Sequence, residues 1–479
     1  MEKSYSRKHV ASSMAWRFGE RILAQLTTFI VSVVLARKLS ASDFGNVALL
    51  MVFIDVFNVF VVHGFSSALV QKKDPDTIDY SSVLFFSLFV AMLFYAFAYF
   101  AAPLLARMGD ALLPALFRVL ALRLPIGAIN SVQHAYVQKN MDFRKFFFSS
   151  LIGTLLSAVV GISMAYSGYG AWSIVAQYLT NSLCDTIVLA FTIDWRPKLV
   201  MDLQRLTQLL KFGWKVLFSQ LVHVVFQRLT TFFVGMRYSS SDLAYYEQGQ
   251  KIPGIFETNV DTTINSVLFP VMANAQNEPE RLKLMIRRSI QTSSAVIWPM
   301  MIGIAVLADQ LLLFVYTDKW LPSTAFMMIA AIKLGFEPAQ SANLQAIKAV
   351  GRSDLYLKME IAKKTYGIIT LLVCVRISVL AVAIAAASQA LFSAVVNGVV
   401  NCRLFHYSIT EQADDILKSF LLSALMGFAV WGAKIILPYS VPVLFAEILI
   451  GVAVYVTLSY IWNKSQITYL LSIMRSFRM

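Results

Sequence analysis

The chain has 479 residues, of which 58% are hydrophobic and 14% charged, and its net charge is +14. This hydrophobic share is far above that of soluble globular proteins, so composition excludes a soluble enzyme and places most of the chain in lipid. Three cysteines, at 184, 374 and 402, have spacings that suit neither a disulfide framework nor a metal site. We expect no cofactor.

Fourteen apolar stretches predict an all-α polytopic membrane protein, because a helix needs about 20 residues to cross a hydrocarbon core of about 30 Å. The N-terminus has no short apolar core followed by a cleavage site, so we expect the first stretch to remain as a span. The expected spans are 12–36, 44–70, 82–105, 112–136, 146–167, 170–193, 209–236, 243–272, 286–308, 322–347, 360–378, 379–402, 415–437 and 441–462. The run 365–400 is interrupted mainly by Arg376, which leaves the boundaries of the eleventh and twelfth spans the least defined.

Basic residues alternate between successive loops, as the positive-inside rule requires. With the N-terminus in the cytoplasm, 26 Lys and Arg residues fall in the cytoplasmic tails and loops, 6 fall in the opposite loops and 9 lie in the spans. This placement favours a membrane protein over a nucleic-acid-binding one. It predicts that both termini are cytoplasmic.

The spans are expected to form two pseudo-symmetric lobes of six helices and an appended pair. We expect an N-lobe at 1–193, a cytoplasmic amphipathic linker at 194–208, a C-lobe at 209–402, and a C-terminal pair with a tail at 403–479. In the linker, Arg196, Lys198 and Arg205 suit anionic head groups.

A short internal repeat supports the two lobes. The segment ARKLSASDFG (36–45) corresponds to GMRYSSSDLA (235–244), and each copy follows one apolar span and opens the next. Because six spans separate the copies, they have the same orientation. A parallel repeat of this kind predicts a binding cavity between the halves.

Charged residues inside the spans indicate a polar path, because a charge in hydrocarbon is costly unless it faces a cavity or a partner. In the first span, Arg17, Glu20 and Arg21 share one helix face, which is either a cavity-lining stripe or a local packing cluster. Asp55 in the second span has no basic neighbour in its own helix. It is therefore a candidate for ion or proton coupling, with His63 as a possible proton partner; the alternative is a static pair with Arg17 or Arg21.

Further charges lie in later spans. The cations of the fourth and seventh spans have no acid within their own helices, and Lys333 and Glu337 form an i, i+4 pair in the tenth. The eighth span is the most polar and resembles a broken helix after Pro253 and Gly254. Candidate substrate-binding cations are Arg17, Arg21, Arg118, Arg123, Lys215, Arg228 and Lys333; candidate coupling groups are Asp55, His63, Glu20, Glu257 and Asp261.

Catalytic motifs are absent from the sequence. It has no Gly-rich phosphate loop, no cluster with metal-ligand spacing and no loop longer than about twenty residues. A membrane-embedded glycosyltransferase needs a larger extramembrane region to hold its sugar and acid/base residues. The sequence therefore favours a transporter over an enzyme.

Several motifs resemble those of a known family. They are ARKLSASDFGNVAL (36–49), GFSSALVQKKD (64–74), HAYVQKNMDFRKF (134–146), YGAWSIVAQYL (169–179), DWRPKL (194–199), LLKFGWKVLFSQL (209–221) and VLFPVMANAQNEPERLK (267–283). In order and spacing they resemble the polysaccharide exporters and flippases of the multidrug/oligosaccharidyl-lipid/polysaccharide (MOP) superfamily. The resemblance is to the Wzx-like branch, which includes colanic-acid and lipopolysaccharide O-unit transporters. It covers at least 12–288 and is only general beyond Arg352.

The resemblance implies an inner-membrane flippase that moves undecaprenyl-pyrophosphate-linked oligosaccharide to the periplasmic leaflet by alternating access. Its implied partners are the lipid-linked oligosaccharide, membrane lipids, H+ or Na+, and a polysaccharide polymerase or export complex, without nucleic acid. The chain departs from its relatives at Thr230 and Thr231, where they often carry an Asp, so no role of that acid transfers.

Two other readings remain open. One is a cation-coupled multidrug antiporter of the same architecture, which would have an acid-dominated cavity. The other is a scaffold of a polysaccharide assembly complex that transports nothing, for which charges in a cavity would be unnecessary. Replacing those charges would leave export intact in the scaffold.

Overall fold

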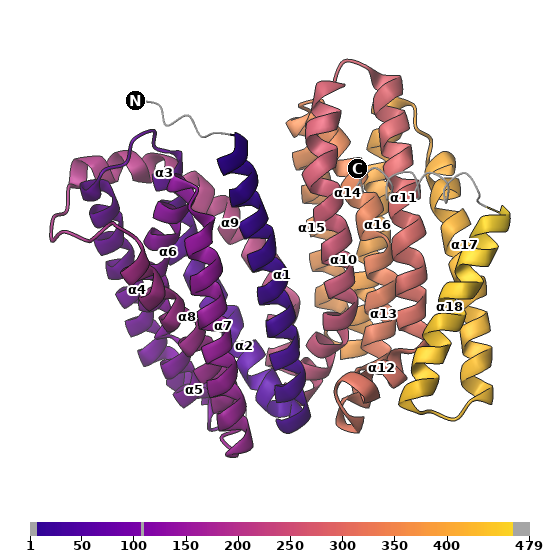
Figure 1. The fold of residues 1–479 in the computed structure, drawn as a ribbon, viewed down its shortest axis with the longest axis horizontal. Helices are drawn as coiled ribbons and strands as arrows, with labels where there is room; N and C mark the ends of the chain where they lie inside the picture. The colour runs from indigo at the N-terminus through magenta and orange to yellow at the C-terminus, as the bar shows by residue number, and fades with distance from the viewer. Residues whose placement is uncertain (1–6, 107–109, 463–479) are drawn as a thin grey trace. The chain divides into compact units, whose positions relative to one another are not determined.

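The structure is a computed structural model that describes residues 7–106 and 110–462. Within these ranges, the side chains of residues 7–15, 17, 18, 21, 22, 63, 64, 212 and 263–267 lie outside the description. The described chain divides into two compact units, Met1–Ala244 and Tyr245–Met479. Figure 1 shows that both consist of helices.

The first unit is a bundle whose helices follow the expected spans closely. It contains α1 (Arg7–Lys38), α2 (Ala41–Asn58), α3 (Gly64–Gln71), α4 (Thr77–Leu105), α5 (Leu113–Leu120), α6 (Arg123–Asn140), α7 (Phe143–Tyr166), α8 (Ala171–Thr192) and α9 (Leu203–Arg237). A π-helical segment, Val59–His63, joins α2 to α3, so that 41–71 forms one helical span. A turn at residues 121 and 122 separates α5 from α6 within the expected fourth span.

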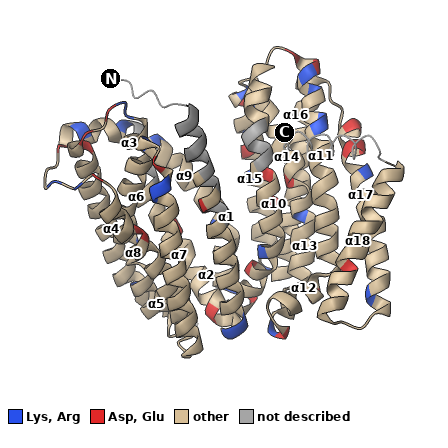
Figure 2. Ribbon diagram, viewed as in Figure 1, with Lys and Arg blue, Asp and Glu red and all other residues tan. Residues whose placement is uncertain are grey.

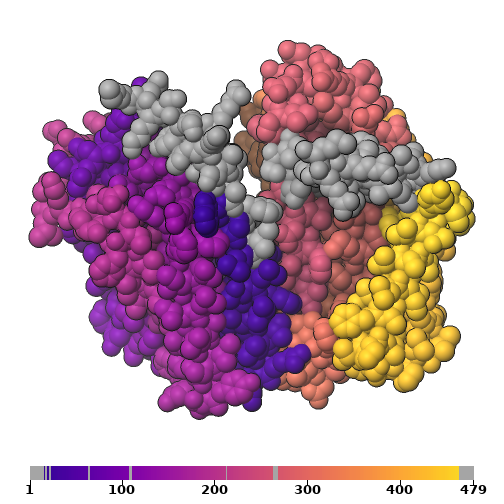
Figure 3. Space-filling model, viewed as in Figure 1, coloured from indigo at the N-terminus to yellow at the C-terminus, as the bar shows by residue number. Residues whose placement is uncertain are grey.

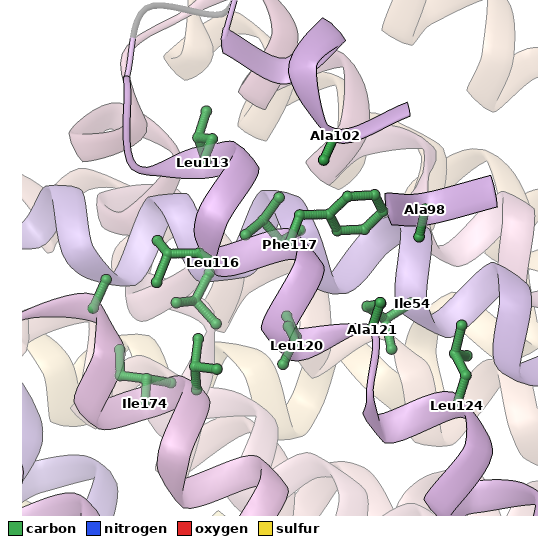
Figure 4. Close-up of a cluster of buried hydrophobic side chains, with 14 of the residues drawn as sticks. Ile54, Ala98, Ala102, Leu113, Leu116, Phe117, Leu120, Ala121, Leu124 and Ile174 are labelled. Atoms are coloured by element: carbon green, nitrogen blue, oxygen red, sulfur yellow. The ribbon is translucent and has the colours of Figure 1, made fainter. Parts of the chain in front are cut away.

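The core of the first unit forms where α2, α4, α5, α6 and α8 meet. Figure 4 shows this cluster, in which Phe117 of α5 extends toward Ala98 of α4. Ile54, Leu116 and Leu120 are each completely buried. Because lipid tails are as apolar as these side chains, their burial stabilises the bundle through close van der Waals packing, which the small alanines of α4 allow.

The second unit is also a helical bundle. Besides the greater part of α10 (Ser240–Asn274), it contains α11 (Pro279–Val306), α12 (Ala308–Val315), a 3₁₀ segment (Asp318–Ser323), α13 (Thr324–Gly335), α14 (Glu337–Ala349), α15 (Ser353–Cys374), α16 (Val379–Phe405), α17 (Ile409–Ile436) and α18 (Val441–Trp462). The last two helices form a hairpin, and α17 packs against α11. Figure 1 shows this pair, in yellow, along one side of the unit.

The predicted all-α membrane fold is confirmed, and the predicted count of fourteen spans is compatible with the structure. In the described part of the chain, 10 helical segments are long and apolar enough to cross a membrane. The run 365–400 contains two helices, α15 and α16, separated by a turn at 375–378. The expectation of a broken eighth span was wrong: α10 runs continuously through Pro253 and Pro270. A proline removes only one main-chain donor, and neighbouring groups compensate for it in membrane helices.

The boundary between the compact units lies after α9, whereas the expected boundary between lobes was the linker 194–208. By packing, α9 contacts α2 and α3 in the first unit. The pair α17–α18 belongs to the second unit. The expected functional lobes remain a prediction.

Both copies of the internal repeat fold into the same local structure, a capping box. At the start of α2 the Asp43 backbone N–H donates to Ser40 Oγ, and Asp43 Oδ2 accepts from the Ser40 N–H at 3.0 Å. At the start of α10, Asp242 and Ser239 make the equivalent pair of bonds. Such boxes satisfy main-chain N–H groups that have no partner within the helix.

The two copies contact each other within the first unit. A Cβ at Gly45 would lie 1.6 Å from the Ser240 carbonyl oxygen, so only glycine allows this approach. Ser240 Oγ also donates to Asn46 Oδ1 at 2.5 Å. The sequence pattern that the two copies share therefore lies at two helix starts that pack against each other.

Candidate substrate and coupling sites

The main charged pair inside the spans of the first unit joins α2 to α9. An Arg228 guanidinium nitrogen lies 2.7 Å from Asp55 Oδ2, and the side chains are 39% and 21% exposed, respectively. Neither residue has an opposite charge within its own span, as the sequence indicated, and the alternative pairing of Asp55 with Arg17 or Arg21 falls on side chains outside the described residues. The partner that the structure shows for Asp55 is Arg228, because α9 packs directly on α2 and brings an oppositely charged residue from 173 positions away in sequence.

The helix that carries Asp55 continues into the π-helical segment at Val59–His63. Such segments add a residue to a helical turn and are frequent at functional sites. Asn58, one turn beyond Asp55, has a buried Oδ1 atom without a hydrogen-bond partner. The side chain of His63, the expected proton partner, lies outside the described residues.

Arg118 and Arg123 rest against aromatic rings. Arg118 lies 4.5 Å from the ring centroid of Tyr99 and donates from Nε to its carbonyl oxygen at 3.2 Å. Arg123 lies 5.4 Å from the ring centroid of Tyr178 on α8 and contacts Met51 Sδ at 3.7 Å. Among the described residues no carboxylate lies within salt-bridge distance of either arginine. Cation–π contacts orient a guanidinium without neutralising it.

A polar cluster that sequence reasoning did not identify lies between α6 and α8. Asp185 Oδ2 accepts from Asn130 Nδ2 at 2.8 Å and lies 2.9 Å from His134 Nε2. The tautomer of His134 decides whether its Nε2 donates in this contact. One signal was available: Asn130 and His134 are four residues apart and share a helix face.

The charged stripe of the first span is described only at Glu20. Its Oε1 accepts from Ser150 Oγ of α7 at 3.1 Å. The side chains of Arg17 and Arg21 lie outside the described residues. Lys215 lies on α9 and is exposed.

The second unit places the remaining candidates near one another. Glu257 and Asp261 of α10, Lys333 of α13 and Glu337 of α14 interact electrostatically. Lys333 therefore lies near acids from two other helices, α10 and α14. This environment favours a neutralised packing charge over a free cation for an anionic ligand.

Figure 2 shows charged residues concentrated at helix ends, with a few inside the spans of each unit. In the part of the chain that the structure describes, no group of three or more His, Cys, Asp or Glu residues could hold a metal ion. The intramembrane groups are cations on aromatic rings, ion pairs and amide–carboxylate contacts. They can bind anions, protons or monovalent cations.

This combination of apolar helical spans with charges inside them defines a multi-pass membrane protein. Its fold resembles that of the lipid II flippase MurJ in an inward closed conformation, with a TM-score of 0.75 and 16% identity over 95% of this chain and 100% of that one. It also resembles an inward-facing multidrug resistance transporter of the MOP superfamily, with a TM-score of 0.63 and 15% identity over 80% and 94% of the two chains.

The chain belongs to the polysaccharide biosynthesis protein family, whose profile matches residues 34–325. The succinoglycan biosynthesis transport protein ExoT of Rhizobium meliloti (strain 1021) is 25% identical over 353 residues, covering 74% of this chain and 72% of the relative. The teichuronic acid biosynthesis protein TuaB of Bacillus subtilis (strain 168) is 22% identical, covering 78% of each. The lipopolysaccharide biosynthesis protein WzxC of Escherichia coli (strain K12) is 19% identical over 66% of this chain and 64% of the relative. The resemblance inferred from the motifs is confirmed: the chain is a multi-pass membrane protein of a polysaccharide biosynthesis family.

Proposed function

We propose that the protein moves undecaprenyl-pyrophosphate-linked oligosaccharide from the cytoplasmic to the periplasmic leaflet of a bacterial inner membrane. Alternating access between the lobes 1–193 and 209–402 moves the sugar, while the lipid chain stays in the bilayer. The family supports the substrate class. The undecaprenyl diphosphate linkage is proposed from the resemblance of the sequence motifs, and the cations inside the spans suit such an anionic group.

The proposal rests mainly on Arg123, whose charge has no carboxylate partner among the described residues. This residue lies at the start of α6, inside a predicted span, and is half-buried. Its contacts with Tyr178 and Met51 hold the guanidinium without cancelling its charge. A phosphate oxygen is the natural partner for a positioned guanidinium in a dry site.

Coupling is proposed to act through the pair of Asp55 and Arg228. A proton or Na+ that binds Asp55 would remove the attraction at the 2.7 Å contact and release Arg228. The freed guanidinium would then bind the anionic substrate. Arg228 would thus pair either with Asp55 or with the substrate, and binding of the ion to Asp55 would decide which. In this scheme the coupling ion shifts the balance between states by differential binding.

The substrate role is tested with Arg123→Ala and Arg123→Lys, and with Arg403→Ala as a matched loss of an exposed arginine at the end of α16. Loss of a charge-assisted contact weakens binding by about 1.5–3 kcal/mol, or roughly ten- to hundredfold. Arg123→Ala is expected to reduce surface polysaccharide and raise cytoplasmic-leaflet lipid-linked oligosaccharide at normal protein levels. Arg123→Lys should retain part of the activity. Normal export by Arg123→Ala would contradict the proposal and favour a scaffold.

Orientation is tested by cysteine labelling at Ser167 and Gln276, both of which are exposed. With cytoplasmic termini, a membrane-impermeant maleimide reaches position 167 from the periplasm and reaches position 276 only after permeabilisation. Labelling of both positions from one side would overturn the proposed topology.

A further inference from the structure

A cavity in the second unit opens between helices α14, α16 and α17 and has a volume of about 350 Å³. That size falls within the range of ligand-binding sites, about 300–1,000 Å³. Its lining on α17 recurs at helical spacing and therefore occupies one face of that helix. The lining residues of α17 are Ile409, Gln412, Ala413, Ile416, Leu417 and Phe420. Figure 3 shows one face of the molecule, with α17 and α18 in yellow.

One end of the cavity is apolar and the other carries amides. Trp298 and Phe420 lie at the apolar end, with ring centroids 4.8 Å apart. At the other end, Asn343 Nδ2 donates to Gln412 Oε1 at 3.1 Å, and Gln412 Nε2 donates to the Tyr407 carbonyl oxygen at 2.9 Å. The amide end is therefore built by protein contacts.

Two atoms at the amide end have no partner in the described structure: Gln340 Nε2 and Asn343 Oδ1. Their residues are only 8% and 4% exposed. A buried amide donor without an acceptor is destabilising, so a polar group of a ligand would be stabilised there. The cavity thus requires a molecule with a long apolar part and a hydrogen-bond acceptor at one end.

The depth of the amides matches the boundary between hydrocarbon and head groups. Helix α17 has 28 residues, Ile409–Ile436, or about 42 Å at 1.5 Å per residue, which exceeds a hydrocarbon core of about 30 Å. About 6 Å at each end therefore lies in the interfacial region. Gln412, the fourth residue of the helix, lies at that boundary, and Phe420 lies two turns deeper.

We propose that this cavity binds one acyl chain of a glycerophospholipid from the leaflet at the N-terminus of α17, with the ester carbonyl accepting from Gln340 Nε2. The residues that line the cavity include no charged side chain. An isoprenoid diphosphate carries its charge next to the chain and would need a cation here, whereas an ester carbonyl needs only an amide donor. The bound chain takes the place of protein side chains between α16 and α17.

The proposal is tested in vesicles with a phosphatidylethanolamine whose acyl chain carries a diazirine, followed by mass spectrometry of cross-linked peptides. Adducts are expected in 391–398 and 409–420. Ala413→Phe fills the cavity and should reduce these adducts at least about threefold. Ala429→Phe, at an exposed alanine of the same helix that does not line the cavity, should leave them unchanged.

A second variant, Gln340→Leu, removes the donor and keeps the volume; loss of one neutral hydrogen bond predicts about two- to tenfold fewer adducts. Equal labelling of the wild type, Ala413→Phe and Gln340→Leu, at matched unfolding midpoints, would overturn the proposal. So would displacement of the phospholipid probe by a diazirine-bearing polyprenyl phosphate. None of these readouts depends on transport, so they are independent of the proposed flippase activity.

Discussion

The two units hold their charged residues in different ways. In the second unit, Asp415 of α17 is 1% exposed and accepts four hydrogen bonds: two from Arg287, one from Gln291 and one from Tyr407. In the first unit, Asp55 and Arg228 form a single contact and both side chains are partly exposed. A carboxylate with four partners is a fixed part of the packing. A carboxylate with one charged partner can exchange it, which is what coupling requires.

The largest expected effect breaks the network of the second unit. Asp415→Ala removes the buried acceptor of four hydrogen bonds and leaves Arg287, whose side chain is 35% exposed, with only the longer contact to Glu411. The loss should therefore exceed the roughly 1 kcal/mol of an exposed pair. Thermal unfolding in detergent should show a large loss of stability, and membrane protein levels should fall together with export. Asp414→Ala is the matched control, because its pair with Lys418 is more than half exposed and it should have little effect. If the Asp415→Ala protein were stable but impaired in transport, the network would have a role in transport and not in stability.

In the first unit, the pair of Asp55 and Arg228 should matter more for transport than for stability. Asp55→Asn and Arg228→Gln should each change the stability of unfolding by no more than about 1 kcal/mol, since the pair is partly exposed. In Asp55→Asn, transport in vesicles under imposed pH or Na+ gradients should lose its gradient dependence while downhill movement remains. In Arg228→Gln, downhill movement should fall as well, because the proposed contact with the substrate is lost. Asp194→Asn, at a carboxylate that is 88% exposed, serves as the control.

Exchanging the two charges provides a stricter test of the same pair. The double variant Asp55→Arg with Arg228→Asp should restore stability relative to either single substitution, because the contact re-forms in reverse. Gradient dependence unchanged in Asp55→Asn would show that Asp55 does not couple transport, whatever the stability data show.

A smaller effect is expected at the edge of the second unit's network. Lys283 Nζ lies 3.1 Å from Glu411 Oε1, and both side chains are partly exposed. Glu411→Gln preserves the hydrogen bonds that cap α17 and removes only the ion pair, so we expect a loss of about 0.2–1 kcal/mol. If Glu411→Gln lost as much stability as Asp415→Ala, the ion pair at the edge of the network would be as important as the carboxylate of Asp415.

The smallest effect concerns a pair outside the spans. Asp76, which caps α4, lies 2.5 Å from Arg205 of α9. Burial alone would raise the pKa of Asp76, but hydrogen bonds from the Asp79 N–H and Arg205 outweigh it and lower that pKa to about 2. Because the folded pKa is below the ordinary value of 3.8, the stabilisation is present above pH 4 and is lost as pH falls toward 2.

The Asp76→Asn variant should lose less stability than the wild type as pH falls from 5 to 2. Unfolding curves recorded across this pH range measure the difference. The difference should also shrink at high salt, because exposed pairs are screened. An identical pH profile in the variant would assign the acid sensitivity to other carboxylates.

The sequence by itself determined the helices, since their signals are local. Apolar length placed the spans, and the repeat at 36–45 and 235–244 indicated that each copy opens a span. The sequence also located the charges inside the spans. Two helices in the run 365–400 were favoured by its length together with the prediction that both termini are cytoplasmic, which requires an even number of spans.

Only the tertiary structure decided which of those charges are paired. Asp55 meets Arg228 and Asp185 meets His134 because helices distant in sequence pack together, and an ion pair depends on a distance of a few ångströms that no local pattern encodes. The same holds for the π-helical segment after Asn58 and for the amide-lined cavity at Gln340. Apolar periodicity shows that a helix is buried or in lipid, whereas side-chain partners depend on how neighbouring helices are rotated about their axes.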